Sequence, residues 1–563
     1  MNGGSRQILS VVSLFLGVYI LPLGLRPMVT PDEFRYAEIP REMLVHQRWV
    51  VPTLNGLPYF EKPVLGYWLN AVSIGAFGPS PFSVRLPSAI ASGVTALLVV
   101  WLAAHVSFGR ATTALSAAIL LSSLQFFGTG VFAVLDGPFT AFVTGTMVFF
   151  YVGFSASDSG RRIRWLALSG CCCGAAFLTK GFIGVVLPFL SIVTFVFFEQ
   201  KLWKAVKVAW IPALAAVVAA LPWSILVHIR ETGFWRYFVW TEHIQRFLHP
   251  GNGQHPEPIW FFLPILVVGA LPWTPVLPAA LEGLRADKSF RSVVVYASCW
   301  FVVPCVFVSL SSGKLATYVL PSYPPLALLT AIGLTAYFGS GRRLLWSLGA
   351  ATSALVLLIG SLVILAWRAD LFEPAQQWRA VVLAAALVVG TVLSLAAARA
   401  NGARATTLLA LAPVFFLLSL PVAFESKPMA AVSPGGFLDG FRERVHPRTT
   451  LVSDVDTIHA VCWVFGRDDV VLLGNPGELD FGTKKADRGK RHLESGRLVD
   501  YAKKNNLEIL VFAGEYNTFD EFSDGMPAPI FQAREGELVF AEFRIPRLEN
   551  PSEGFCLTQD TYR

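Results

Sequence analysis

The polar stretch from Thr30 to Asn70 gathers side chains that can do chemistry, in a sequence that otherwise avoids charge. Its charged residues include Asp32, Glu33, Arg35, Glu38, Arg41, Glu42, Glu61 and Lys62. Carboxylates can take up or release a proton, and cationic groups can hold an anionic substrate. Ionisable groups close to a lipid bilayer are costly and usually mark a site. The stretch therefore predicts a reactive pocket at a membrane surface, and the alternative is a solvated loop beside the membrane.

Helix and turn signals position these residues. Pro31 ends the first apolar segment, and Asp32 and Glu33 follow where the N-terminus of a helix favours carboxylates. Apolar residues then recur at helical spacing as far as Leu44, which predicts a short amphipathic helix lying along the membrane surface. Prolines and an Asn-Gly pair between positions 52 and 63 predict turns that bring the chain back toward this helix. The turns present Tyr59, Glu61 and Lys62.

The composition is that of an integral membrane protein. The 563 residues are 54% hydrophobic and 15% charged, with a mean hydropathy of +0.56. The net charge of +7 comes from basic residues scattered over short loops, which excludes a basic stripe for nucleic acid. About thirteen apolar segments approach the ~20 residues that cross a bilayer. They are 8–25, 83–105, 112–129, 138–154, 165–180, 183–198, 207–228, 259–281, 292–310, 316–337, 344–366, 379–398 and 405–424.

The connections between these segments predict the orientation. Alternate connections are all basic, as at Arg161 and Lys201, and the positive-inside tendency assigns them to the cytoplasm. The polar stretch, the short loop at Asp136, the loop at 229–258 and the C-terminal tail fall on the opposite side. We therefore expect the chemistry to face outward. The first segment has no A-x-A site after it, so we expect a retained signal anchor.

The chain changes character at Glu425. Strand patterns at 449–453, 470–473, 508–512 and 538–544 alternate with helical patterns near 456–466 and 495–504. These patterns predict a membrane domain over 1–424 and a small soluble α/β domain over 425–563. The segment 474–489 is expected to be a mobile surface loop, and no Gly-rich phosphate motif predicts a nucleotide site. Cys462 and Cys556 both fall in this domain, and the sequence leaves open whether they form a disulfide.

The order of residues in the polar stretch resembles one glycosyltransferase family. The shared elements are D-E-x-R-Y-A, R-E-M-L, W-V-V-P-x-L-N-G and Y-F-E-K-P-x-L-G-Y-W. They resemble the first outer loop of bacterial polyprenyl-phosphate-dependent glycosyltransferases of the lipid A 4-amino-4-deoxy-L-arabinose transferase group, which are related to protein O-mannosyltransferases. Val64 departs from the family, which usually has a second proline there. The resemblance fades after about Pro325, and it implies the multi-span type C glycosyltransferase fold in a bacterial inner membrane, with a periplasmic site.

The resemblance also implies an inverting transfer of a sugar such as 4-amino-4-deoxy-L-arabinose from undecaprenyl phosphate to an envelope acceptor such as lipid A. In this reading Asp32 and Asp136 are catalytic, although Asp32 could be a helix N-cap and Asp136 a turn residue. Lys62 would meet the lipid phosphate or, in the alternative, reach up to lipid head groups. The other residues expected at the phosphate or sugar are Arg35, Tyr36, Tyr59, Arg246 and Tyr318, and Lys314 is a further candidate.

Members of the family can hold a metal between the glutamate of E-K-P and a histidine of the 229–258 loop. Glu61 with His243 or His255 would be the ligands of a zinc-like ion here, and interfacial hydrogen bonding is the alternative. No nucleotide cofactor is expected. A protein O-mannosyltransferase-like or other cell-wall sugar transferase remains an alternative function, as does a transporter or flippase for the lipid-linked sugar. The charges gather at one surface and no half of the chain is repeated, which disfavours a transporter.

Overall fold

The computed structural model describes residues 12, 15–245, 256–423, 426–484 and 491–545. The chain forms two compact units, each continuous in space but not in sequence. The membrane unit consists of Met1–Met28, Ile39–Pro52 and Phe60–Ala430. The α/β unit consists of Val29–Glu38, Thr53–Tyr59 and Ala431–Arg563. The predicted soluble domain at 425–563 therefore takes in two further segments from the polar stretch.

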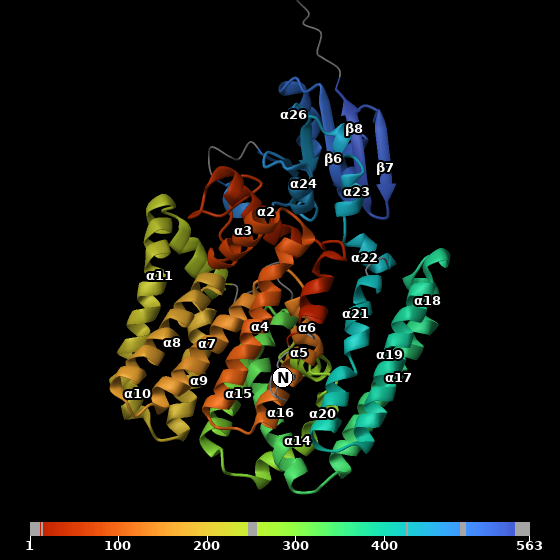
Figure 1. Ribbon diagram of the computed structural model, residues 1–563. Helices are drawn as coiled ribbons and strands as arrows, with labels where there is room; N and C mark the ends of the chain where they lie inside the picture. The colour runs from red at the N-terminus through yellow and green to blue at the C-terminus, as the bar shows by residue number, and fades with distance from the viewer. Residues whose placement is uncertain (1–11, 13–14, 246–255, 424–425, 485–490, 546–563) are drawn as a thin grey trace, which may run out of the picture. The chain divides into compact units, whose positions relative to one another are not determined.

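The membrane unit is a bundle of long helices (Figure 1). Within the described residues, eight helices are long and apolar enough to cross a membrane. They are Pro81–His105, Asp136–Ser155, Trp210–Arg230, Arg291–Leu310, Ala316–Gly339, Leu344–Ala366, Pro374–Arg399 and Gly402–Ala423. Two bent pairs, Arg110–Ser122 with Leu124–Gly130 and Phe262–Gly269 with Thr274–Ala286, bring the number to ten if each is one span.

All ten coincide with predicted spans, and the remaining three of the thirteen do not meet the same test. The segment 165–180 lies in helix α8 (Ser159–Lys180), whose first turns carry arginines. Helix α9 (Ile183–Phe198) has only 16 residues. The segment 8–25 lies partly outside the described residues. Short or charged helices of this kind are difficult to classify by hydropathy alone.

Apolar side chains cover the outside of the bundle. Helix α11 (Trp210–Arg230) leaves Val217, Val218 and Leu221 about half exposed, as a lipid-facing helix requires. Inside, small residues allow close approach: a Cβ built on Gly283 of α14 (Leu277–Ala286) would lie 1.9 Å from the backbone oxygen of Gly333 in α16 (Tyr323–Gly339). Such small-residue contacts hold membrane helices together where the hydrophobic effect between helices is weak.

The predicted helix of the polar stretch is confirmed as α2 (Asp32–His46). Residues Asp32 to Glu38 group with the α/β unit and the rest of the helix with the membrane unit. After α2 the chain makes a two-stranded hairpin, β1 (Thr53–Leu54) and β2 (Leu57–Pro58). Asn55 and Gly56 turn between the strands with positive φ angles of 54° and 66°. An Asn-Gly pair suits this turn because both positions need φ above zero.

The α/β unit is built on a six-stranded sheet of order β5-β4-β3-β6-β8-β7. Its strands are β3 (Thr450–Ser453), β4 (Val471–Leu473), β5 (His492–Leu493), β6 (Ile509–Glu515), β7 (Phe531–Glu535) and β8 (Leu538–Arg544). The neighbouring strands β5, β4, β3 and β6 pair in parallel, while β8 pairs antiparallel with β6 and β7. The sheet and the helices α26 (Leu498–Lys504) and α27 (Tyr516–Ser523) enclose one core of apolar side chains. Helix α24 (Ile458–Phe465) contributes none of the described residues of this cluster, although its Ile458 and Val461 are buried.

Four of these strands and helices α24 and α26 confirm the sequence prediction. The prediction missed β5, which has only two residues, and β7, whose sequence F-Q-A-R-E is polar and largely exposed. The expectation of a mobile loop at 474–489 was wrong in its first half. Gly477–Leu479 and Asp480–Thr483 form helical turns, and Leu479, the last residue of the first turn, is fully buried. Residues 485–490 lie outside the described part of the chain.

Candidate functional site

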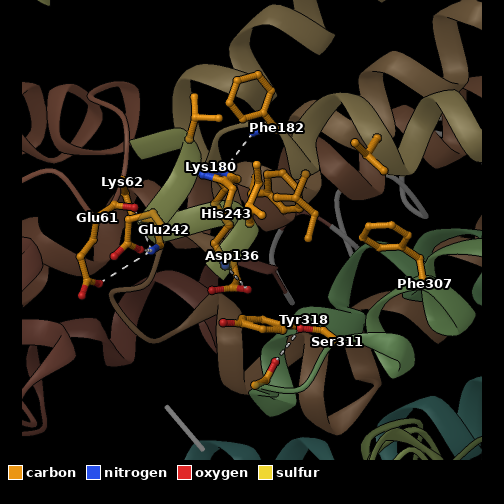
Figure 2. Close-up of a pocket in the computed structure, with 16 residues that line it drawn as sticks. Glu61, Lys62, Asp136, Lys180, Phe182, Glu242, His243, Phe307, Ser311 and Tyr318 are labelled. Carbon is orange, nitrogen blue, oxygen red and sulfur yellow. Dashed lines mark hydrogen bonds and ion pairs between the residues drawn. The ribbon is translucent and has the colours of Figure 1, made fainter. Parts of the chain in front are cut away.

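A cavity of about 560 Å³ opens in the membrane unit (Figure 2). Its polar lining comes from widely separated parts of the sequence: Glu61, Lys62, Asp136, Lys180, Glu242, His243, Ser311 and Tyr318. Its apolar lining includes Phe139, Phe182, Ile183, Val186, Val239, Ile244 and Phe307. A cavity of this size with a few convergent polar groups is the usual form of a small-molecule site. Its charged side chains beside an apolar wall suit a ligand with an anionic head and a hydrocarbon part.

Asp136 and Lys180 form the tightest ion pair of the cavity. Asp136 is the first residue of α7 (Asp136–Ser155) and Lys180 is the last residue of α8, so each charge stands at the helix end that favours it. The Lys180 Nζ lies 2.7 Å from the Asp136 Oδ1, and the side chains are only 12% and 10% exposed. The same ammonium lies 5.4 Å from the centre of the Tyr318 ring. The predicted residues Asp136 and Tyr318 therefore meet around a lysine.

Lys180 was missed by the sequence analysis. Its only signal was a lysine at the outer end of an apolar segment, next to Gly181. Such lysines are common at membrane interfaces, where they reach to lipid head groups, so the type of residue alone does not distinguish a site.

Lys62 supplies the second cation of the cavity. Its Nζ donates a hydrogen bond to the backbone oxygen of Glu61 at 3.0 Å and lies 3.7 Å from the Glu61 carboxylate. The carboxylate of Glu242 lies 3.8 Å from the same nitrogen. Tyr237 donates a hydrogen bond to Glu242 at 3.2 Å, which fixes this carboxylate. Lys62 therefore stands between two carboxylates in the cavity wall.

His243 lies in the cavity wall on η3 (Arg236–Gln245). Its Nδ1 donates to the backbone oxygen of Phe238 at 2.7 Å, and its Nε2 accepts from the backbone nitrogen of Phe182 at 3.3 Å. The rings of both phenylalanines pack edge to face against the imidazole. With both nitrogens bonded to backbone groups, the imidazole is oriented by the protein.

The described residues leave a metal held by Glu61 and His243 as a prediction. Among them, no group of three or more His, Cys, Asp or Glu side chains is arranged to hold an ion. His255, the other predicted ligand, lies outside the described residues, so a metal site that includes it stays a prediction. Arg246, predicted at the phosphate, lies outside them as well. Lys314 is nearly buried, and its Nζ donates to the backbone oxygen of Glu257 at 2.6 Å.

The other predicted residues meet in the α/β unit, around Glu478. Arg35 clamps the Glu478 carboxylate with two bonds, Nε to Oε1 at 3.0 Å and Nη2 to Oε2 at 2.7 Å. Its third nitrogen, Nη1, donates to the Asp32 Oδ1 at 2.7 Å. Tyr59 donates to the Glu478 Oε2 at 3.0 Å, and the Nε2 of His459 contacts Oε1. Tyr36 is buried in the same unit.

The electrostatics of this cluster are set by charge pairing in a buried place. Burial by itself would raise the pKa of the Glu478 carboxyl, but the Arg35 guanidinium and the hydrogen bonds from His459 and Arg35 hold it well below its ordinary range. Asp32 is the first residue of α2, with a side chain that is 46% exposed. One of its oxygens is held by Arg35.

The sulfur of Cys462 is buried in the α/β unit, 3.6 Å from the Asn55 Oδ1. Cys556 lies outside the described residues, so a disulfide between them stays untested.

Comparison with known proteins identifies the family of the chain. Residues 4–238 match the dolichyl-phosphate-mannose-protein mannosyltransferase family, and residues 429–542 match the C-terminal domain of the arabinosyl transferase ArnT. The chain is 35% identical to the undecaprenyl phosphate-alpha-4-amino-4-deoxy-L-arabinose arabinosyl transferase of Aeromonas hydrophila, over 92% of this chain and 95% of that protein. The chain belongs to this arabinosyl transferase family. The protein of the same name from Yersinia enterocolitica is 34% identical, over 94% of this chain and 96% of that protein.

A solved structure shows the same fold. ArnT from Cupriavidus metallidurans, bound to undecaprenyl phosphate, superimposes with a TM-score of 0.82 at 23% identity, covering 96% of this chain and 98% of that one. The apo form of the same protein gives a TM-score of 0.81. The expected multi-span glycosyltransferase fold with a C-terminal sheet domain is therefore confirmed, and the chain is a multi-span membrane glycosyltransferase.

Proposed function

We propose that this protein transfers 4-amino-4-deoxy-L-arabinose from undecaprenyl phosphate to lipid A, at the periplasmic face of the inner membrane. The proposal is supported most directly by one cavity that contains two lysines and an apolar wall. A lipid phosphate needs cations for its phosphate and an apolar surface for its hydrocarbon chain. The names of the relatives in Aeromonas and Yersinia point to the same donor.

The chemistry assigns a part to each charge. The acceptor oxygen forms a bond to the anomeric carbon while the bond from that carbon to the phosphate oxygen breaks, and the electron pair leaves with the phosphate. Negative charge grows on the leaving phosphate, where Lys62 and Lys180 can stabilise it, with Tyr318 as a hydrogen-bond donor. Positive charge grows on the sugar ring, where the Asp136 carboxylate can stabilise it. A single displacement of this kind inverts the configuration at the anomeric carbon.

Asp32 is proposed as the catalytic carboxylate of the D-E-x-R-Y-A element. If the acceptor is a hydroxyl, Asp32 takes its proton as a general base. If the acceptor is an ionised phosphate of lipid A, no proton has to move, and Asp32 then orients the acceptor or stabilises the ring charge. A zinc-like ion, if bound, would be held by Glu61 with His243 or His255, and no step above is assigned to it.

The test uses purified full-length protein in detergent with undecaprenyl-phosphoryl-4-amino-4-deoxy-L-arabinose and lipid A. Mass spectrometry should show lipid A that has gained one sugar, and Asp32→Asn and Lys62→Met should abolish or strongly reduce the gain. A sugar found on peptide instead of lipid A would indicate a protein O-mannosyltransferase-like activity. Movement of the labelled donor across vesicles without transfer would indicate a transporter. Equal turnover of Asp32→Asn and the wild type would overturn the role of Asp32.

A further inference from the structure

The carboxyl edge of the parallel strands in the α/β unit receives part of the chain itself. In open parallel sheets, ligands bind outside the carboxyl ends of the strands, near the point where strand order reverses. Here that point lies between β3 and β6, because β4 and β5 extend the sheet on the other side of β3. His459 and Glu478 follow β3 and β4 at this edge, and both contact side chains from the polar stretch.

Several bonds attach the segment Val29–Glu38 to this edge. The Thr30 hydroxyl donates to the backbone oxygen of Asp456, directly after β3, at 2.9 Å. The Thr30 backbone nitrogen donates to the backbone oxygen of Val432 at 2.8 Å. Arg35, one turn further on, forms the bidentate clamp with Glu478. The place where a related fold would bind a ligand is thus taken by the start of α2, which carries Asp32.

The carboxylate of Glu478 is fully committed to this contact. Its two oxygens receive four donors, two from Arg35, one from Tyr59 and one from His459. The Glu478 and Arg35 side chains are each 13% exposed, so each requires the opposite charge beside it. The fork of Arg35 is planar, so its position on Glu478 also fixes the direction of Nη1, which holds Asp32.

We propose that Glu478 is a positioning residue for the transfer reaction, which acts through Arg35 on the catalytic carboxylate of Asp32. The inference rests on the proposed role of Asp32. By occupying two nitrogens of Arg35, Glu478 restricts the guanidinium to one bond with Asp32. Asp32 then keeps its second oxygen for the reaction.

The consequence of losing Glu478 follows from charge. In Glu478→Gln, the buried guanidinium keeps Asp32 as its only carboxylate partner among these groups, and we expect it to turn toward both oxygens of that carboxylate. A carboxylate held in this way accepts a proton less readily and no longer points in its original direction. Displacing a catalytic group by about 1 Å can lower the rate by about 100-fold.

The experiment compares Glu478→Gln with Asp480→Asn in the full-length protein. Asp480 lies two residues away, is 46% exposed and pairs with the exposed Lys484, so its variant should keep the wild-type rate. Glu478→Gln should lower kcat by about 10- to 100-fold. Its affinity for undecaprenyl phosphate should not change, because every residue that lines the cavity belongs to the membrane unit. Loss of that affinity, or an unchanged kcat, would overturn the proposal.

A double-mutant cycle separates positioning from general destabilisation. Arg35→Lys keeps the charge but loses the planar fork, so it should lower kcat in the same way. If Glu478 acts through Arg35, the double variant should lose little more than the worse single variant, whereas two independent defects would multiply. Multiplying losses would contradict the inference. Should Asp32→Asn instead match the wild type, the proposed role of Asp32 fails, and that result is distinct from a failure of Glu478 alone.

Discussion

Asp136 and Lys180 form a buried ion pair in which each charge is compensated by the other. Removing one partner of a buried ion pair leaves an uncompensated charge and typically costs about 3–5 kcal/mol. We expect Lys180→Met to lower the thermal stability of the membrane unit and to reduce transferase activity at least tenfold. The assay pairs the melting temperature in detergent with turnover.

Lys427→Met is the matched control for this variant. Lys427 forms an ion pair with Glu373 in the same unit, but the two side chains are 45% and 64% exposed, so the change should be nearly neutral. Full activity and an unchanged melting temperature in Lys180→Met would show that the pair has neither role.

Glu478 makes the stability of the α/β unit depend on pH in a defined direction. Its pKa is depressed in the folded state, so its contribution is complete above its unfolded pKa of about 4.3 and is lost as the pH falls toward its folded pKa. The difference in stability between the wild type and Glu478→Gln should therefore be constant from about pH 8 to 5 and should shrink below about pH 4.3. Hydrogen exchange of the β3 and β6 amides measures it. A difference that grows on acidification would contradict this account.

The residues that the sequence identified and those it missed differ in a physical way. Lys62, Asp136 and Tyr318 stand in distinctive motifs, and the structure gathers all three in one cavity. Glu478 stands in a stretch rich in Gly and charge, which resembles a mobile loop. Its importance comes from Arg35, 443 residues earlier in the chain, and no local pattern encodes a pairing at that separation.

At the scale of elements, the side chain of Asn55 helps to attach the hairpin of β1 and β2 to the rest of the α/β unit. Asn55 is fully buried, and its side-chain amide makes the two hydrogen bonds that a neighbouring strand would make with Val470. Nδ2 donates to the backbone oxygen of Val470 at 2.8 Å, and Oδ1 accepts from the backbone nitrogen of Val470 at 2.9 Å. Asn55→Ala leaves both backbone groups buried without these bonds, so we expect a loss of about 2–4 kcal/mol. The rate of hydrogen exchange at the Val470 amide should rise as this stability is lost.

Asn505→Ala provides the comparison, because that side chain is exposed and bonds only to the backbone oxygen of Tyr501, one turn away. An Asn55→Ala protein that protects Val470 as well as the wild type does would contradict the attachment.

The elements that were predicted well have strong local periodicity. Long apolar helices such as α17 (Leu344–Ala366) and strands such as β8 read clearly from the sequence because burial repeats along them. The failures are elements whose partners decide their state, such as the polar edge strand β7 and the short parallel strand β5. The interleaving of the polar stretch with the C-terminal sheet had no local signal either, because a segment of ten residues carries no mark of the sheet it joins.

At the scale of the whole molecule, the proposed orientation assigns the two sides of the membrane to different loops. Single cysteines introduced at Asp524, in the α/β unit, and at Ser289, between α14 and α15 (Arg291–Leu310), are both at exposed positions. A maleimide that cannot cross membranes should label Asp524→Cys in intact spheroplasts and should label Ser289→Cys only after lysis. The unsubstituted protein gives the background from its native cysteines. The reverse pattern would place the cavity on the cytoplasmic side.

The three-segment construction of the α/β unit sets an order for biosynthesis. The segment with Asp32 and Arg35 leaves the ribosome early, but Glu478 follows 443 residues later. At about 5–20 residues per second, this interval is on the order of 20–90 s. During that time the Arg35 guanidinium has Asp32 beside it in sequence but lacks the Glu478 carboxylate, and a translation product that stops before Glu478 never acquires that partner. If Glu478 positions Asp32 as proposed, full activity requires the last sixth or so of the polypeptide, and prematurely terminated chains should transfer little sugar.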